Sequence, residues 1–226
     1  MIARQFFISL SYIFHPVLMP FLGLYLLFNL ETLPVSYNRT DALFYFPDQA
    51  KTYIYLIIGI LTILAPLLSL FIMYYNKIIT SMHLGNKEER VYPFILVSFY
   101  YFLSYYYLRV QIPEELSHPA LVGFSFGILV LFLACFIMNF YTKISLHAAG
   151  IFGLSGSLLA YSQTQLPPFG VEHPTNIYFI LYLLLVAGLV SSGRLYLKVH
   201  KLSEVIWGAA FGFGIMYATV KYGLFI

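Results

Sequence analysis

Charged residues are scarce in this sequence. Asp, Glu, Lys and Arg together make up 9% of the 226 residues, whereas hydrophobic residues make up 61%. An ordinary water-soluble domain carries about 25% charged residues. The surface of a water-soluble protein needs more charged residues than this chain has. The composition therefore excludes a soluble protein of one or two domains. It predicts one membrane-embedded domain of residues 1–226.

Cysteine and basic runs are also nearly missing. Cys135 is the only cysteine and lies in an apolar run, which excludes a framework of disulfides within the chain. No run of Lys and Arg, alone or interleaved with aromatic residues, suggests contact with nucleic acid. We therefore expect the lipid bilayer to be the main surroundings of the chain, with no nucleic-acid partner.

What the chain has instead is long apolar segments. A helix rises about 1.5 Å per residue, so it crosses the hydrocarbon layer in about 20 residues. Seven segments approach this length, the third and fifth being short: 6–30, 53–75, 93–108, 120–141, 145–162, 176–192 and 203–224. Their apolar residues do not alternate, which favours helices over membrane strands. We expect an all-α polytopic transmembrane bundle of six to seven spans, the first of them a retained N-terminal segment.

Seven spans place the connecting segments alternately on two faces of the bundle. The face that holds the N-terminus, which we call side A, receives the segments 76–92, 142–144 and 193–202. Its cations are Arg4, Lys77, Lys87, Arg90, Lys143, Arg194, Lys198 and Lys201. Its only carboxylates are Glu88, Glu89 and Glu204. The positive-inside rule explains such a bias without any function, and the alternative is a face that binds anions.

The spacing around one histidine favours that alternative. Arg194 precedes His200 by six residues, and Glu204 follows it by four. If a helix runs through His200, this interval puts the two side chains on one face; if Ser203 caps the helix, the histidine lies in the preceding turn. A carboxylate beside a histidine fixes its tautomer and stabilises the imidazolium, as a nucleophilic or general-base histidine requires. His15 and His83 lack such neighbours, and we expect structural roles for them.

Three segments of side A resemble, in order, the signatures of the type 2 phosphatidic acid phosphatase family. The segment GRLYLKVHKLSEVIWG, at 193–208, resembles the third signature, which reads Ser-Arg, five residues, His, three residues, Asp. The segment KISLHAAG, at 143–150, is similar to the second, Ser-Gly-His. The segment GNKEERVYP, at 85–93, is similar to the first, Lys, six residues, Arg-Pro. The third match is the most specific of the three.

The chain departs from every one of these signatures. Leu146 stands where the second signature has glycine, and Gly193 stands where the third has serine. Glu204 replaces the aspartate of the third signature. In the first, Lys87 precedes Arg90 by only three residues, and Val-Tyr separates the arginine from the proline. The change at Leu146 removes a glycine that would let the backbone approach a phosphate closely.

The resemblance implies a role for each matched residue. His200 would attack phosphorus to form a phosphohistidine, and Glu204 would orient it. His147 would protonate the departing oxygen and later help water to release phosphate. The phosphate-binding residues implied by the match are Lys87, Arg90, Ser145 and Arg194. No metal and no cofactor are implied, and side A has few carboxylates to hold magnesium.

The sequence therefore favours a membrane-embedded phosphatase that acts on an amphiphilic phosphorylated lipid or lipid pyrophosphate. The alternative is a non-catalytic protein on the same scaffold that binds or transports lipid phosphates. A transporter more often carries ionisable residues in the middle of its spans, whereas His147 and His200 lie at span ends. The resemblance implies a bacterial inner (cytoplasmic) membrane, with the active site on the non-cytoplasmic face. Apart from the candidate phosphate ligands, the cations do not favour either orientation.

Overall fold

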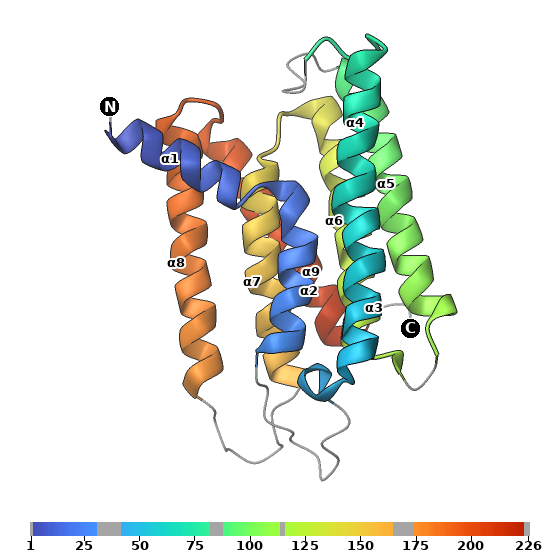
Figure 1. Ribbon diagram of the computed structural model, residues 1–226. Coiled ribbons are helices and arrows are strands. Elements are labelled where there is room, and N and C mark those ends of the chain that lie inside the picture. Colours follow the sequence, from blue (N-terminus) through green and yellow to red (C-terminus); the bar gives the residue numbers. More distant parts are fainter. Residues whose placement is uncertain (1, 31–41, 82–87, 114–115, 165–173, 224–226) are drawn as a thin grey trace.

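Helices form every regular element in the part of the chain that the structure describes. This computed structural model describes residues 2–30, 42–81, 88–113, 116–164 and 174–223 (Figure 1). The elements are α1 (Ile2–Ile13), η1 (Pro16–Leu18), α2 (Met19–Asn29), η3 (Leu43–Tyr45), α3 (Asp48–Gly59), η4 (Ile60–Leu64), α4 (Ala65–Tyr75), η5 (Glu88–Arg90), α5 (Val91–Tyr106), η6 (Tyr107–Gln111), α6 (Pro119–Tyr141), α7 (Leu146–Thr164), α8 (Pro174–Tyr196) and α9 (Leu202–Tyr222). Six helical stretches in these ranges are long and apolar enough to cross a membrane. The prediction of an all-α polytopic bundle is confirmed, and the chain is an integral membrane protein.

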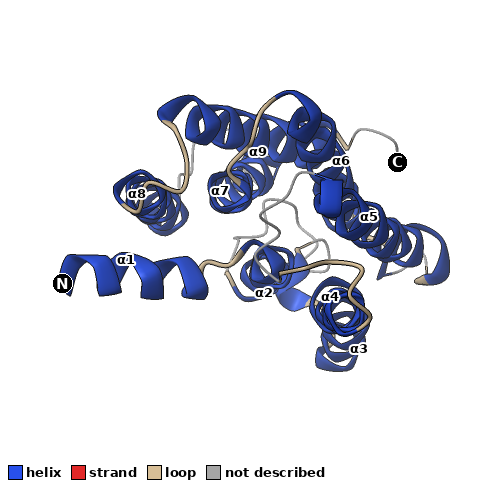
Figure 2. Cartoon of the chain, turned by 90° about the horizontal axis from the view of Figure 1, so that it is seen from above, coloured by secondary structure: helices blue, strands red, loops and turns tan. Residues whose placement is uncertain are grey.

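The first apolar stretch, Ile2–Asn29, is long enough to span but is not one straight helix. It breaks at His15, whose backbone is extended (φ −67°, ψ 136°). The next residue is Pro16, and a proline disfavours helical backbone in the residue before it. In Figure 1, α1 lies crosswise at one end of the bundle, whereas α2 runs along it, and in Figure 2 α1 extends sideways from α2 at the edge of the bundle. None of the residues of α1 is buried.

A second proline is accommodated inside a continuous helical stretch. The stretch from α3 through η4 to α4 contains Pro66, which has no N–H to donate to the preceding turn. The segment directly before it, η4, is a π-helix, and the N–H of Ala65 donates to the carbonyl of Ile60. The wider π turn therefore redistributes the backbone hydrogen bonds at the proline, as expected for a proline within a span.

The centre of the bundle is the contact between α7 and α9, which lie side by side in Figure 2. Glycines make their backbones touch. A Cβ atom at Gly208 would lie 2.6 Å from the carbonyl oxygen of Ser145, and one at Gly212 would overlap the carbonyl of Ala149. Gly208 and Gly212 form a G-x-x-x-G pattern, which permits such close helix packing in membranes.

The ends of the helices alternate between two faces, as predicted. The N-terminal helix α1, the end of α4, and the junctions α6–α7 and α8–α9 lie at one end of the molecule, the upper end in Figure 1. This end is side A. The starts of α3 and α8 and the end of α7 lie at the opposite end.

The packing of α7 on α9 yields a test with a control in the same helix. We expect Gly212→Ala to destabilise the protein by about 1–3 kcal/mol, the usual cost of an overpacked contact, because the new Cβ would overlap the Ala149 carbonyl. Gly214→Ala should be neutral or slightly stabilising, since no heavy atom lies within 4 Å of its Cβ position. Equilibrium unfolding in detergent measures both; equal stabilities for the two variants would contradict this account.

Candidate functional site

The pairing of His200 with Glu204 is the best-defined polar contact at side A. The Nδ1 atom of His200 lies 2.8 Å from Oε2 of Glu204, and the two side chains are only 7% and 11% exposed. Helix α9 begins at Leu202 with Lys201 as its N-cap residue, so the histidine precedes the helix rather than belonging to it. The same Glu204 oxygen accepts the backbone N–H of Lys201 at 3.2 Å, which caps the helix. One carboxylate therefore holds both the helix start and the histidine.

The turn that carries His200 is fixed from two directions. Two residues after the end of α8, Lys198 has a left-handed backbone (φ 55°), and the N–H of Val199 donates back to the Arg194 carbonyl at 3.2 Å. From the α6–α7 junction, Lys143 Nζ donates to the carbonyl of Val199 at 2.9 Å. These contacts hold the short connection between α8 and α9 against α7, with the histidine on it.

A further hydrogen bond joins the connection between α6 and α7 to the first turn of α9. The N–H of Ser145 donates to the backbone carbonyl of Glu204 at 3.1 Å. Ser145 Oγ accepts the N–H of Ala148 at 3.4 Å, as a residue that caps α7 does. The serine is fully buried. Its observed role is to cap α7 and join α9, and its predicted role as a phosphate donor stays a prediction.

The charges around His200 determine its protonation. Burial lowers its pKa most; the hydrogen bond that His200 donates to Glu204 and the charge of that carboxylate oppose this, and the positive charges of Lys143 and Arg194 lower the pKa further. The net direction is downward, so the imidazole is neutral at pH 7. A carboxylate only accepts hydrogen bonds, so Nδ1 carries the proton and Nε2 keeps the lone pair. This is the tautomer that a nucleophilic Nε2 atom requires.

His147 and Arg194 meet at a residue of α1. The Nε2 atom of His147 lies 3.1 Å from the carbonyl oxygen of Ser11, and Nη1 of Arg194 donates to Ser11 Oγ at 3.3 Å. His147 is the second residue of α7, and Arg194 lies in the last turn of α8. Within the described residues, the buried Nε of Arg194 has no hydrogen-bond partner. The structure thus links His147 and Arg194 through Ser11, and Arg194 lies near enough to His200 for its charge to lower that histidine's pKa. That the three residues form one site stays a prediction.

Arg90, predicted from the first signature as a phosphate ligand, bonds to an amide side chain. Arg90 lies at the start of α5, and its Nη1 donates to Oδ1 of Asn139 on α6 at 3.2 Å. This contact ties Arg90 to the end of α6. Lys87, the other predicted ligand from that signature, lies outside the described residues.

Sequence reasoning missed two contributors from the N-terminal stretch. The sequence predicts no role for Ser11 and a structural role for His15. The rings of His15 and His147 are 5.7 Å apart, centre to centre, and meet edge to face. Gly150 seats the segment after His15 against α7, since a Cβ there would lie 2.7 Å from Met19. The His15–Pro16 pair was a sign of a break at this position, but its position beside α7 depends on tertiary packing.

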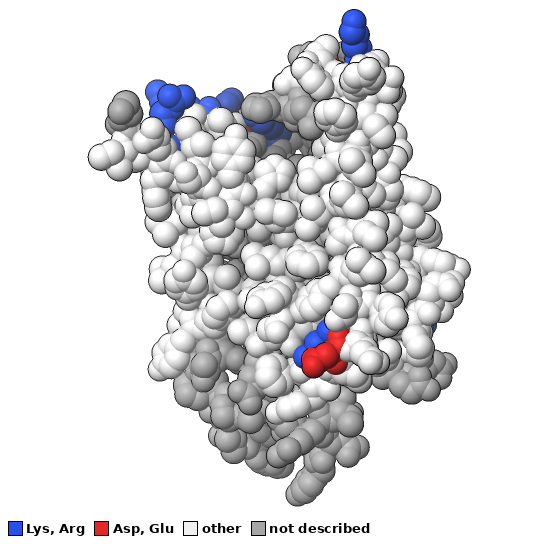
Figure 3. Space-filling view, in the orientation of Figure 1, with Lys and Arg blue, Asp and Glu red and all other residues white. Residues whose placement is uncertain are grey.

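Side A is also where the positive charges collect. Figure 3 shows most of the visible Lys and Arg side chains along the end where α1 lies. Among the described residues, no three His, Cys, Asp or Glu side chains converge in a way that could hold a metal ion. The positive charges that act on His200 are those of Lys143 and Arg194.

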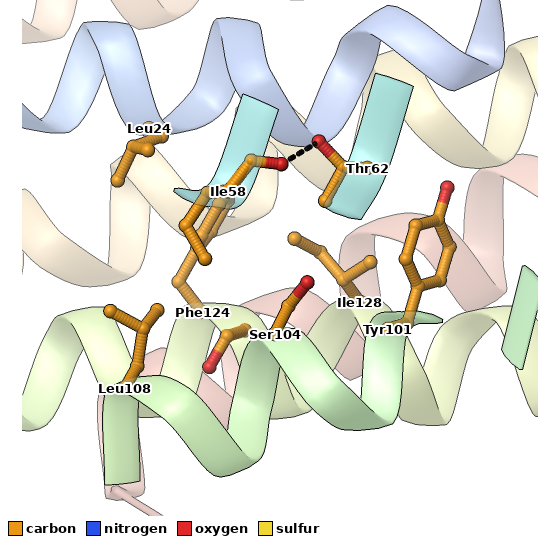
Figure 4. Close-up of a pocket in the computed structure, with 9 residues that line it drawn as sticks. Leu24, Ile58, Thr62, Tyr101, Ser104, Leu108, Phe124 and Ile128 are labelled. Atoms are coloured by element: carbon orange, nitrogen blue, oxygen red, sulfur yellow. Dashed lines mark hydrogen bonds between the residues drawn. The ribbon is translucent and has the colours of Figure 1, made fainter. Parts of the chain in front are cut away.

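A cavity in the other half of the bundle is not suited to phosphate. It lies among α2, α3, η4, α5, η6 and α6, and its lining residues are Leu24, Ile58, Thr62, Tyr101, Ser104, Leu108, Phe124, Ser125 and Ile128 (Figure 4). The hydroxyls of Thr62, Ser104 and Ser125 all donate to carbonyls of their own helices. An apolar space without a cation offers nothing to bind an anion.

Comparisons with protein-family models, with curated proteins and with solved structures gave no match to this chain.

The charges around His200 predict opposite responses to two substitutions. Lys143→Gln should raise the pKa of His200, because a positive neighbour that disfavours the imidazolium is lost. Glu204→Gln should lower it, because the carboxylate that favours the imidazolium is lost. Lys198→Gln is the control and should leave it unchanged. Ring-proton NMR titration in detergent micelles measures these pKa values, with the His200 signal assigned by its loss in His200→Asn; shifts of the same sign in the first two variants would refute the assignment.

Proposed function

We propose that the protein is a membrane-embedded phosphatase that removes phosphate from an amphiphilic phosphorylated lipid through a phosphohistidine at His200. The observation that carries the proposal is the shielded pair of His200 and Glu204. It leaves the lone pair of Nε2 free for attack and lies close enough to Arg194 for that charge to depress the histidine's pKa. Nucleophile, orienting carboxylate and a cation for the phosphoryl group then occupy one end of the bundle.

The chemistry follows from the roles of the side chains. In the first step the Nε2 lone pair of His200 forms a bond to phosphorus, while the bond from phosphorus to the lipid oxygen breaks. The departing oxygen takes that electron pair and a proton from the imidazolium form of His147, which becomes neutral. In the second step water attacks the phosphohistidine, gives a proton to His147, and releases inorganic phosphate and the neutral His200.

Arg194 supplies the charge stabilisation that phosphoryl transfer needs. The buried Nε, unpartnered among the described residues, and the Nη1 atom are both donors that phosphoryl oxygens can use. Phosphoryl transfer depends mainly on positioning and charge neutralisation, so an arginine held in the last turn of α8 is well suited to it. Lys143 adds a second positive charge near His200.

A lipid is the substrate class that suits the position of this site. The site lies at one end of a membrane bundle, beside a crosswise helix with exposed apolar side chains such as Phe6 and Tyr12. A phosphate at headgroup level reaches this position while its acyl or prenyl tail stays in the bilayer. On the family resemblance, we place side A on the non-cytoplasmic face of a bacterial inner membrane.

The nucleophile is tested by replacing it with an amide of similar shape. His200→Asn should abolish phosphate release from phosphatidic acid and polyprenyl pyrophosphate, while phosphate binding by Arg194 stays within a fewfold of the unmodified protein. Phosphate release and binding of inorganic phosphate are the two measurements. Arg194→Ala should lose both, because the phosphoryl oxygens lose their main cation. The exposed residue Tyr222, at the far end of α9, provides the control Tyr222→Phe, which should be fully active.

Hydrolysis by the His200→Asn protein at the unmodified rate would refute the mechanism. Phosphate binding without any turnover by the unmodified protein would favour the alternative, a non-catalytic lipid-phosphate binder on the same scaffold.

The reaction should not depend on a divalent ion. We expect hydrolysis to persist in excess chelator, because Arg194 and Lys143 supply the positive charge that magnesium supplies elsewhere. Vanadate should inhibit, since it adopts the trigonal bipyramid of the transferring phosphoryl group. The rate is measured with and without chelator; activity that vanishes with chelator and returns only with magnesium would indicate a different chemistry.

A further inference from the structure

Ser11 of α1 is bonded to two groups that the proposed reaction needs for substrate. Its hydroxyl accepts a hydrogen bond from Nη1 of Arg194, and its backbone carbonyl accepts one from Nε2 of His147. The Ser11 hydroxyl also donates to the Phe7 carbonyl at 2.8 Å, so its own proton is used within α1 and its lone pair is offered to the arginine. One residue thus takes the place that oxygens of a phosphate would take.

The contact with His147 is incompatible with the proton transfer proposed for that residue. A backbone carbonyl only accepts hydrogen bonds, so Nε2 of His147 carries a proton that points at Ser11. A proton held in this way is not directed at a leaving oxygen. Ser11 must therefore move away from His147 before this nitrogen can protonate the departing lipid.

Helix α1 is attached lightly enough to move. It has no buried residue, and four of its side chains, Ile2, Phe6, Tyr12 and Ile13, are more than half exposed. Its apolar contacts include Phe7, which packs against Gly193 and against the ring of Tyr196, 5.1 Å away, and Leu10, which is partly buried against the core. Beyond α1 the chain breaks at His15–Pro16, and the following segment is seated on α7 at Gly150. The break lets α1 swing while α2 stays in place.

We propose that α1 is a surface closure of the site and that Ser11 holds the place of the substrate's phosphoryl oxygens. In the closed state Ser11 satisfies Arg194 and His147. The phosphorylated headgroup replaces Ser11 on both residues, and α1 moves aside over the membrane surface, where its apolar side chains remain in contact with lipid. This inference rests on the proposed function, since it concerns the same site.

A reversible cross-link between α1 and α8 tests the closure directly. A Cβ atom at Gly193 would lie 3.3 Å from the Cβ of Phe7, close to the separation of about 3.5–4.5 Å found in disulfides. In the double variant Phe7→Cys, Gly193→Cys, oxidation should lock α1 in place. We expect hydrolysis of phosphatidic acid in detergent micelles to fall at least about tenfold on oxidation and to recover with reductant. Binding of inorganic phosphate should weaken in parallel.

The controls are the single variants Phe7→Cys and Gly193→Cys, treated with the same oxidant. The natural Cys135 is buried on α6 and is present in all of these proteins. Equal hydrolysis and equal phosphate binding by the oxidised and reduced double variant would overturn the closure and leave the phosphatase proposal intact. If the reduced protein hydrolyses no lipid phosphate, the proposed function fails, and phosphate binding in the two redox states still decides the closure. If inorganic phosphate binds neither the oxidised nor the reduced protein, the proposed closure is overturned.

Ser11→Ala separates the two contacts, because it removes the hydroxyl from Arg194 and keeps the carbonyl near His147. If the hydroxyl competes with phosphate, the variant should bind inorganic phosphate about fivefold more tightly, the size expected for the loss of one competing hydrogen bond. Weaker phosphate binding by Ser11→Ala would mean that the serine is a ligand of the anion, and the placeholder role would be wrong.

Discussion

The site depends on the direct contact between the backbones of α7 and α9. Because Gly208 and Gly212 lack side chains, the start of α9 lies against the start of α7. This brings the connection that carries His200 onto the connection that carries Lys143, and the two are then joined by hydrogen bonds. In a membrane, where lipid tails are as apolar as leucine, close packing of this kind is a main force that holds helices together. The arrangement of the candidate site therefore rests on a contact that two glycines of α9 make possible.

Glu204 links the local fold to the proposed chemistry. As the third residue of α9 it accepts the Lys201 N–H, and with the same oxygen it holds His200. A carboxylate in the first turn is favoured by the helix dipole, so the charge that orients the histidine also stabilises the helix. Its side chain reaches back to a histidine that lies before the helix cap.

Much of the fold and part of the site could be predicted from the sequence. Apolar length predicts the helices and their alternation, because crossing hydrocarbon requires about 20 residues. The interval from His200 to Glu204 predicts their contact, because it is local. The crosswise course of α1 could not be predicted from hydropathy, since an amphipathic surface helix and a short span share much of the same composition. The contacts of Ser11 and His15 with residues of the candidate site could not be predicted, because these partners lie more than 130 positions away in the sequence.

The left-handed backbone of Lys198 has a consequence for the precision of the histidine turn. A side chain other than glycine in this region costs about 1–2 kcal/mol, so the connection between α8 and α9 stores conformational strain. Glycine at this position would relax the strain but would also widen the range of shapes that the connection can adopt. Lysine keeps that range narrow, and the Val199 contacts to Arg194 and Lys143 hold the strained turn in place. The left-handed backbone of Lys198 thus lowers the stability of the chain slightly and restricts the positions that His200 can adopt.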